Sequence, residues 1–212
     1  MRTRLRATVS VIALAISASV SHAGSFEDFF KALSLDDAST VARLVQRGFD
    51  VNARDERGQP ALLLAMHEGS FKVAEGLLGN PQLEVDAANA VGETALMIAA
   101  LKGHLDAARR LLERGARPER NGWNPLHYAA TGPNPAVVKL LLERGVAIDA
   151  RSPNGSTALM MAARYGTEDA VKILLAGGAN ARLRNDLGLQ AGDFARSAGR
   201  ESLAAALDTA SR

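Results

Sequence analysis

The sequence predicts an all-α solenoid, a linear stack of helix-turn-helix units. Two large aliphatic residues recur near the end of helix-compatible segments, at 44–45, 77–78, 111–112, 141–142 and 174–175, with steps of 33, 34, 30 and 33 residues. A glycine that opens each unit recurs at 58, 92, 122, 155 and 188, with steps of 34, 30, 33 and 33 residues. The two independent markers share one period and the same short step, and a fixed period in this range indicates a repeat architecture.

Residues 1–23 have the pattern of a secretory signal peptide. A basic head without acids (residues 1–6) is followed by an uncharged apolar stretch at 7–20 and by Ser-His-Ala at 21–23. The apolar stretch is shorter than the roughly 20 residues that span a bilayer, which favours a cleaved signal over a membrane anchor. We expect cleavage before Gly24 and a periplasmic location, with secretion as the alternative.

The charge balance argues against nucleic acid as a partner. The chain has 25 Lys and Arg against 23 Asp and Glu, a formal net charge of +2. Arg2, Arg4 and Arg6 leave with the predicted signal and no acid does, so 22 basic residues face 23 acidic ones and the net charge becomes −1. Binding to phosphate backbones depends on a positive field that this chain lacks. We also expect no membrane insertion after cleavage and, since the chain has no cysteine, no disulfides.

The same short motif follows the opening glycines. It is GQPAL at 58–62, GETAL at 92–96, GWNPL at 122–126 and GSTAL at 155–159. Each copy continues into an alanine-rich helix and then a second helix such as VVKLLLERG at 137–145. These residues resemble the ankyrin repeat, whose consensus runs roughly G-x-T-P-L-H-x-A-A and later L-L-L and G-A-D-V-N-A, and the resemblance covers about residues 25–210.

The resemblance implies an ankyrin-repeat solenoid of five to six helix-turn-helix units with short β-hairpin loops. The repeat domain is expected at 24–212, after the signal at 1–23. The first and last units match the motif poorly and are expected to act as caps, because the ends of a solenoid must not expose apolar stacking faces. The approximate units are 25–55, 56–89, 90–120, 121–152, 153–185 and 186–212.

Several positions set this chain apart from the consensus. By the resemblance, a side-chain oxygen caps the first helix of each unit, a role that Thr94, Asn124 and Thr157 can fill and Pro60 cannot. His127 is the only histidine at its consensus position. The stretch from Gly115 to Gly122 is shorter than its counterparts, so we expect a shortened finger loop before the fourth unit. In the second helix of that unit, Leu142 is expected in the helix interface.

The sequence contains no group of residues that predicts a catalytic site more strongly than a structural role. It has no cysteine nucleophile, no G-x-S-x-G elbow, no H-E-x-x-H and no glycine-rich phosphate loop. His104 sits at the consensus Gly-His and is expected to order the start of a second helix. We therefore expect no enzyme activity and no cofactor, and keep as the alternative a metal-binding or enzymatic protein that uses His67, His104 and His127.

The resemblance also implies where a protein partner binds: on the concave surface, made of the finger tips and the exposed side of the first helices. Trp123 and Tyr165 are notable because aromatic residues are only 4% of the chain, and exposed aromatics beside arginine are common interface anchors. Trp123 could instead pack locally over the shortened loop. The predicted partner-binding residues are Arg57, Gln59, Val91, Glu93, Leu101, Lys102, Arg120, Trp123, Arg164 and Tyr165.

The expected function is that of an exported, non-enzymatic, monomeric protein-protein interaction module. Two versions stay open: an immunity or inhibitor protein that masks a toxic enzyme, and an accessory protein for envelope stress defence. Fold alone does not name the partner.

Overall fold

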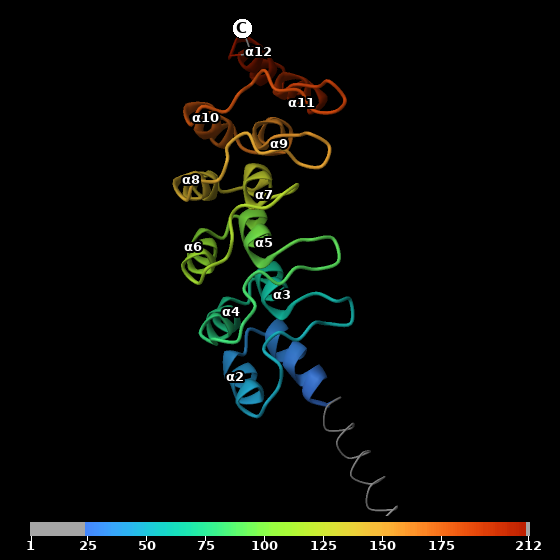
Figure 1. Ribbon diagram of the computed structural model, residues 1–212, viewed down its shortest axis with the longest axis vertical. Helices are drawn as coiled ribbons and strands as arrows, with labels where there is room; N and C mark the ends of the chain where they lie inside the picture. Colours follow the sequence, from blue (N-terminus) through green and yellow to red (C-terminus); the bar gives the residue numbers. More distant parts are fainter. Residues whose placement is uncertain (1–23, 211–212) are drawn as a thin grey trace, which may run out of the picture.

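The computed structural model describes residues 24–210, so the predicted signal at 1–23 lies outside the described residues. The described chain is an all-α stack of two helical layers, as the sequence predicted (Figure 1). The inner layer holds the helix at 24–34 with α3 (Ala61–Glu68), α5 (Ala95–Lys102), α7 (Pro125–Thr131), α9 (Ala158–Tyr165) and α11 (Ala191–Ser197). The outer layer holds α2 (Ala38–Gln46), α4 (Phe71–Leu78), α6 (Leu105–Glu113), α8 (Pro135–Glu143) and α10 (Glu168–Ala176), and α12 (Glu201–Ala210) packs on α11 at the end.

The inner helices begin where the sequence places their caps. The side chains of Thr94, Asn124 and Thr157 accept hydrogen bonds from backbone N–H groups in the first turns of α5, α7 and α9. Pro60 precedes α3 without a side-chain cap. The predicted division of capping roles is therefore confirmed, and each bonded cap satisfies a donor that the first helical turn leaves free.

The core runs through the whole stack between the two layers. Alanines of the inner helices are fully buried, which lets neighbouring inner helices approach closely. In the fourth unit the first leucine of the pair, Leu141, is 0% exposed, whereas Leu142 is only partly buried. Leu142 thus packs against the core as predicted but is not fully buried, and Leu141 holds the fully buried position, since one residue turns the side chain by about 100° around the helix.

The finger loops project on the side opposite the outer helices (Figure 1). Within residues 24–210 they form only isolated bridges, between Arg54 and Pro60 and between Ala88 and Thr94, rather than strands. The loop before α7, residues 114–124, is shorter than the loop before α9, residues 144–157, and projects less. The predicted shortened finger is confirmed.

The first unit is tied to the second by an aspartate that the motif search did not use. Asp36 adopts a left-handed conformation with φ 54°, and its carboxylate accepts a hydrogen bond from the backbone N–H of Val73 in α4 (3.0 Å). Asp37 caps α2 by accepting from Thr40. Hydrogen bonds from Ser39 and Thr40 lower the pKa of Asp37 to about 2. The poorly matching first unit is thus a helix pair joined to the stack.

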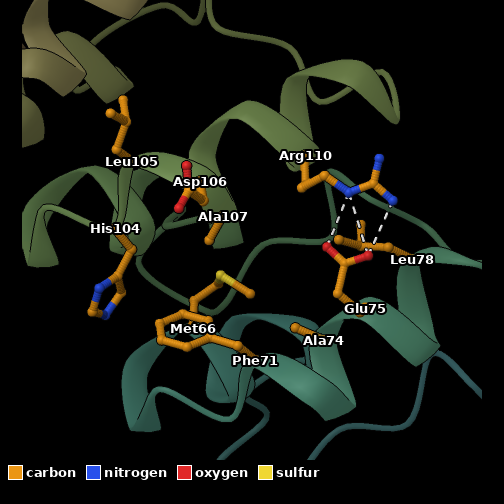
Figure 2. A pocket seen from close by; sticks show the side chains of 10 residues that line it. All are labelled: Met66, Phe71, Ala74, Glu75, Leu78, His104, Leu105, Asp106, Ala107 and Arg110. Carbon is orange, nitrogen blue, oxygen red and sulfur yellow. Dashed lines mark hydrogen bonds and ion pairs between the residues drawn. The ribbon is translucent and has the colours of Figure 1, made fainter.

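The outer layer is interrupted between α4 and α6. α2 packs on α4, α6 on α8 and α8 on α10, but α4 and α6 make little direct contact. A pocket of about 360 Å³ lies between them, with Met66 and Ala74 among its lining residues (Figure 2).

In the described chain, no helix is long and apolar enough to cross a membrane.

Two side-chain pairs bridge this gap, one from each end of the pocket (Figure 2). Arg110 of α6 pairs with Glu75 of α4 at 3.0 Å. His104 lies edge-on against Phe71, with ring centroids 4.7 Å apart. His104 stands at the N-cap of α6, as expected, and its carbonyl accepts a hydrogen bond from the backbone N–H of Ala108 (2.9 Å). Its side chain makes no cap hydrogen bond, and its ring contacts the neighbouring unit instead.

Candidate binding face

The inner face, formed by the finger loops and the exposed ends of the inner helices, carries most of the exposed apolar side chains. Seven large apolar residues are exposed in the described chain, and two of them, Leu35 and Phe71, lie elsewhere. Exposed apolar side chains gathered on one face mark interaction surfaces. The five on the inner face are Val91, Leu101, Tyr165, Leu187 and Leu189.

The ten predicted partner-binding residues all lie on this face and all keep some exposure. The exposed ones are Arg57, Val91, Leu101, Lys102, Arg164 and Tyr165, and the half-buried ones are Gln59, Glu93, Arg120 and Trp123. The structure brings only Leu101 and Trp123 of the ten into one pocket. Arg164 and Tyr165 contact each other instead, with the guanidinium 5.1 Å from the ring centroid.

That pocket, here called the slot, is a cavity of about 220 Å³ beside the shortened finger. Side chains of three consecutive inner helices line it. Sequence reasoning missed Tyr128 and Met161, which share one position of the motif in successive units and both line the slot once the units stack. The slot is lined by Leu101, Trp123, His127, Tyr128, Thr131 and Met161.

Trp123 combines the two roles that the sequence left open. Its ring packs edge-on against His127, with centroids 5.3 Å apart and planes at 78°. It is nevertheless half-exposed and forms one wall of the slot. Because local packing holds the ring in place, little rotational freedom remains to be lost when a partner contacts it.

His127 links the fourth unit to the fifth through hydrogen bonds. Its Nε2–H donates to the carbonyl of Ser156 (3.1 Å), and Nδ1 accepts from the backbone N–H of Asn124 (3.3 Å). Burial lowers the pKa of His127, more than the hydrogen bonds to backbone carbonyls raise it. The buried imidazole is therefore neutral near pH 7 and has both nitrogens engaged.

We expect His127→Ala to lower the free energy of unfolding by about 1–3 kcal/mol, because the Ser156 carbonyl and the Asn124 N–H lose their partner. Since the folded-state pKa lies below the unfolded value of about 6.5, His127 contributes stability above that pH, and the contribution is lost as pH falls. The pKa of His104 is also lowered, mainly by burial, so this second histidine keeps part of the pH dependence in the variant. Urea titrations at about pH 7 and pH 5 should show a weaker pH dependence in the variant. An unchanged midpoint at both pH values would contradict the structural role.

The three histidines of the metal-binding alternative do not come together. His67 lies on α3, His104 lies in the outer pocket and His127 is buried under Trp123. Among residues 24–210, no three His, Asp or Glu side chains gather as a candidate metal site.

A polar network runs along the inner face beside the slot. The hydroxyl of Tyr128 donates to Glu93 (3.0 Å), and the amide of Asn89 donates to Glu93 (2.9 Å) and to Gln59 (3.2 Å). Burial and the Glu93 carboxylate raise the pKa of Tyr128 to about 12. Glu93 thus has its oxygens occupied by neighbours, and two successive finger loops are joined to α7 of the next unit.

A sequence profile described as "Ankyrin repeats (3 copies)" matches residues 29–121 and 116–185. The chain belongs to the ankyrin-repeat family. The ankyrin repeat is a protein-protein interaction module. His127 lies at the consensus histidine of the repeat motif at 122–130, in agreement with its structural role.

Curated ankyrin-repeat relatives are much larger than this chain. Human neurogenic locus notch homolog protein 4 is 48% identical over 89 residues, which is 40% of this chain and 4% of that protein. The mouse B-cell lymphoma 3 protein homolog is 33% identical over 152 residues, 68% of this chain and 34% of that protein. The chain thus spans about a third of the second relative and far less of the first.

One solved structure matches over nearly the whole ankyrin stack. A chain of the complex between the Bd0816 predatory endopeptidase from Bdellovibrio bacteriovorus and immunity protein Bd3460 superposes with a TM-score of 0.74 at 30% identity. The match covers 86% of this chain and 97% of that one. The likeness therefore extends to the length and the shape of the stack.

Proposed function

We propose that this ankyrin-repeat protein is exported to the periplasm, where it acts as a non-enzymatic immunity or inhibitor protein. Its inner face would cover a partner enzyme and block access to it. The observation that carries the proposal is the structural match to a chain of the endopeptidase–immunity protein complex, 97% of which is covered. The basic head and short apolar stretch of residues 1–23 support the export step.

The inner face supplies the features that an enzyme inhibitor needs. It gathers exposed apolar side chains beside arginine, and such residues dominate interface energetics. The slot is held by packed side chains, and the network of Glu93 and Tyr128 by hydrogen bonds. A face that is already ordered loses less entropy on association.

The experiment is capture followed by inhibition. The tagged chain is purified with its partner from a periplasmic fraction, and the partner's hydrolytic activity is titrated with free ankyrin protein. We expect inhibition at one-to-one stoichiometry. Trp123→Ala should weaken binding by about 2 kcal/mol or more, roughly 30-fold, while the outer-face control Phe71→Ala binds as the wild type does.

Two results would overturn the proposal: a captured enzyme that stays fully active at saturation, or a failure to capture any enzyme. Equal binding by the wild type and Trp123→Ala would overturn the role of Trp123 as an anchor and return it to local packing. The denaturant midpoint of each variant is measured on the same preparation, because an unfolded stack would also lose binding. Sequencing of the exported protein should begin at Gly24, and a start at Met1 would contradict export by a cleaved signal.

A further inference from the structure

The slot has the size and lining of a site for one side chain. Its volume of about 220 Å³ lies below the roughly 300–1,000 Å³ of pockets that hold whole small molecules. Its walls are mostly apolar, with Leu101 on α5, Met161 on α9 and the Trp123 ring before α7, the helix between them. An apolar side chain of a partner, aromatic or leucine-like, is the occupant that these dimensions and this lining favour.

Three basic residues lie close in sequence to residues that line the slot. Lys102 directly follows Leu101, Arg120 precedes Trp123 by three residues, and Arg164 lies one helical turn beyond Met161 on α9. Within the described chain, none of the three joins an ion pair, although Arg164 contacts the Tyr165 ring. Glu93 is the carboxylate that contacts the slot lining, through Tyr128.

The charges of the outer helices are arranged differently. Arg110 is paired with both Glu75 and Glu113 on α4 and α6, and Lys172 is paired with Asp169 on α10. Such pairs cancel at a distance, whereas the three cations around the slot leave a local positive potential on a chain of near-zero net charge. That potential attracts and orients carboxylates of a partner.

We propose that the slot anchors an acidic segment of the partner protein. One bulky apolar side chain of that segment enters the slot, and flanking Asp or Glu carboxylates meet Lys102, Arg120 and Arg164. The inference deepens the proposed function and rests on it, because it names the chemistry by which the inner face selects its partner.

Three fluorescein-labelled peptides test this chemistry by fluorescence anisotropy with the full exported chain. The first is Gly-Asp-Glu-Phe-Glu-Asp-Gly, the second has Ala in place of Phe, and the third has Lys in place of every acid. We expect the first to bind at least about tenfold more tightly than either of the others, and its affinity to fall as NaCl is raised. Equal affinities, or preference for the Lys peptide, would overturn the proposal.

Variants of the protein test the site. Thr131→Phe fills the slot from α7, and Leu101→Phe does so from an exposed position on α5, which guards against loss of fold in the first variant. Each should weaken binding of the acidic Phe peptide by about tenfold or more. Lys102→Glu with Arg164→Glu should weaken it similarly, while Arg109→Glu, an exposed cation on the outer helix α6, should not. If neither filling variant weakens binding, the slot is not the anchor.

The two proposals fail separately. Discrimination among the peptides without inhibition of a captured enzyme would leave the slot chemistry standing and remove the inhibitor function. Inhibition that survives both slot-filling variants and the double charge reversal would keep the function and remove the slot as its anchor.

Discussion

Leu141→Ala is expected to lower the free energy of unfolding by about 2–5 kcal/mol, the range measured when a buried leucine is truncated in a close-packed core. Leu141 is 0% exposed and lies between the helical layers of the fourth unit. Few atoms can move to fill the space, because both neighbouring units pack against it. The effect is measured by urea denaturation, with helix content followed by circular dichroism at about 222 nm.

The neighbouring leucine is the matched control. Leu142 belongs to the same helix and has the same side chain, but it is only partly buried, so Leu142→Ala should cost clearly less. If Leu142→Ala proves the more damaging change, the orientation of α8 described here is wrong.

Gly166→Ala is expected to destabilise the stack by about 3 kcal/mol or more, at or above the upper end of the usual cost of overpacking. A Cβ at Gly166 would lie 2.0 Å from the carbonyl oxygen of Ala130 and 2.9 Å from the Cα of Ala162. Both neighbours are backbone atoms, one on the adjacent helix α7 and one on α9, which Gly166 ends, so no side-chain rotation relieves the clash. The φ of Gly166 is −88°, which any residue adopts, so the cost arises from close approach alone.

Gly76→Ala provides the contrast. Gly76 lies inside α4, and nothing lies within 4 Å of the position that its Cβ would take. Alanine is favoured over glycine in a helix interior by about 0.5–1 kcal/mol, so this variant should be as stable as the wild type or slightly more so. Thermal unfolding of both variants against the wild type checks the pair, and a Gly166→Ala protein with an unchanged midpoint would refute the close approach.

Features that repeat along the chain could be predicted from the sequence, because each copy supports the others. The period, the capping roles of Thr94 and Asn124 and the shortened finger were all predicted correctly. The phase within a helix was less secure: two adjacent leucines satisfy the same pattern, and only packing decides that Leu141 faces inward rather than Leu142.

Features that depend on contact between units could not be predicted in the same way. The slot needs Tyr128 and Met161 to lie side by side, which follows from the offset between neighbouring helices rather than from either local motif. Sequence reasoning singled out Trp123 and Tyr165 as interface aromatics, whereas Met161, one helical turn before Tyr165, is the residue of α9 that reaches the slot. The requirement for glycine at 166 has no local signal in the sequence either. It arises because the carbonyl of Ala130, in the preceding unit, leaves no room for a Cβ there.

The gap between α4 and α6 has a mechanical consequence. In a repeat array each unit is coupled only to its neighbours, and at this junction the outer layer contributes an exposed ion pair and a ring contact in place of helix packing. We therefore expect bending stiffness to be low at this junction, so that the first two units can turn as one arm about the inner contact of α3 with α5. The slot lies wholly beyond that joint, on α5, α7 and α9, so the arm can adjust its angle to a bulky partner while the slot keeps its shape.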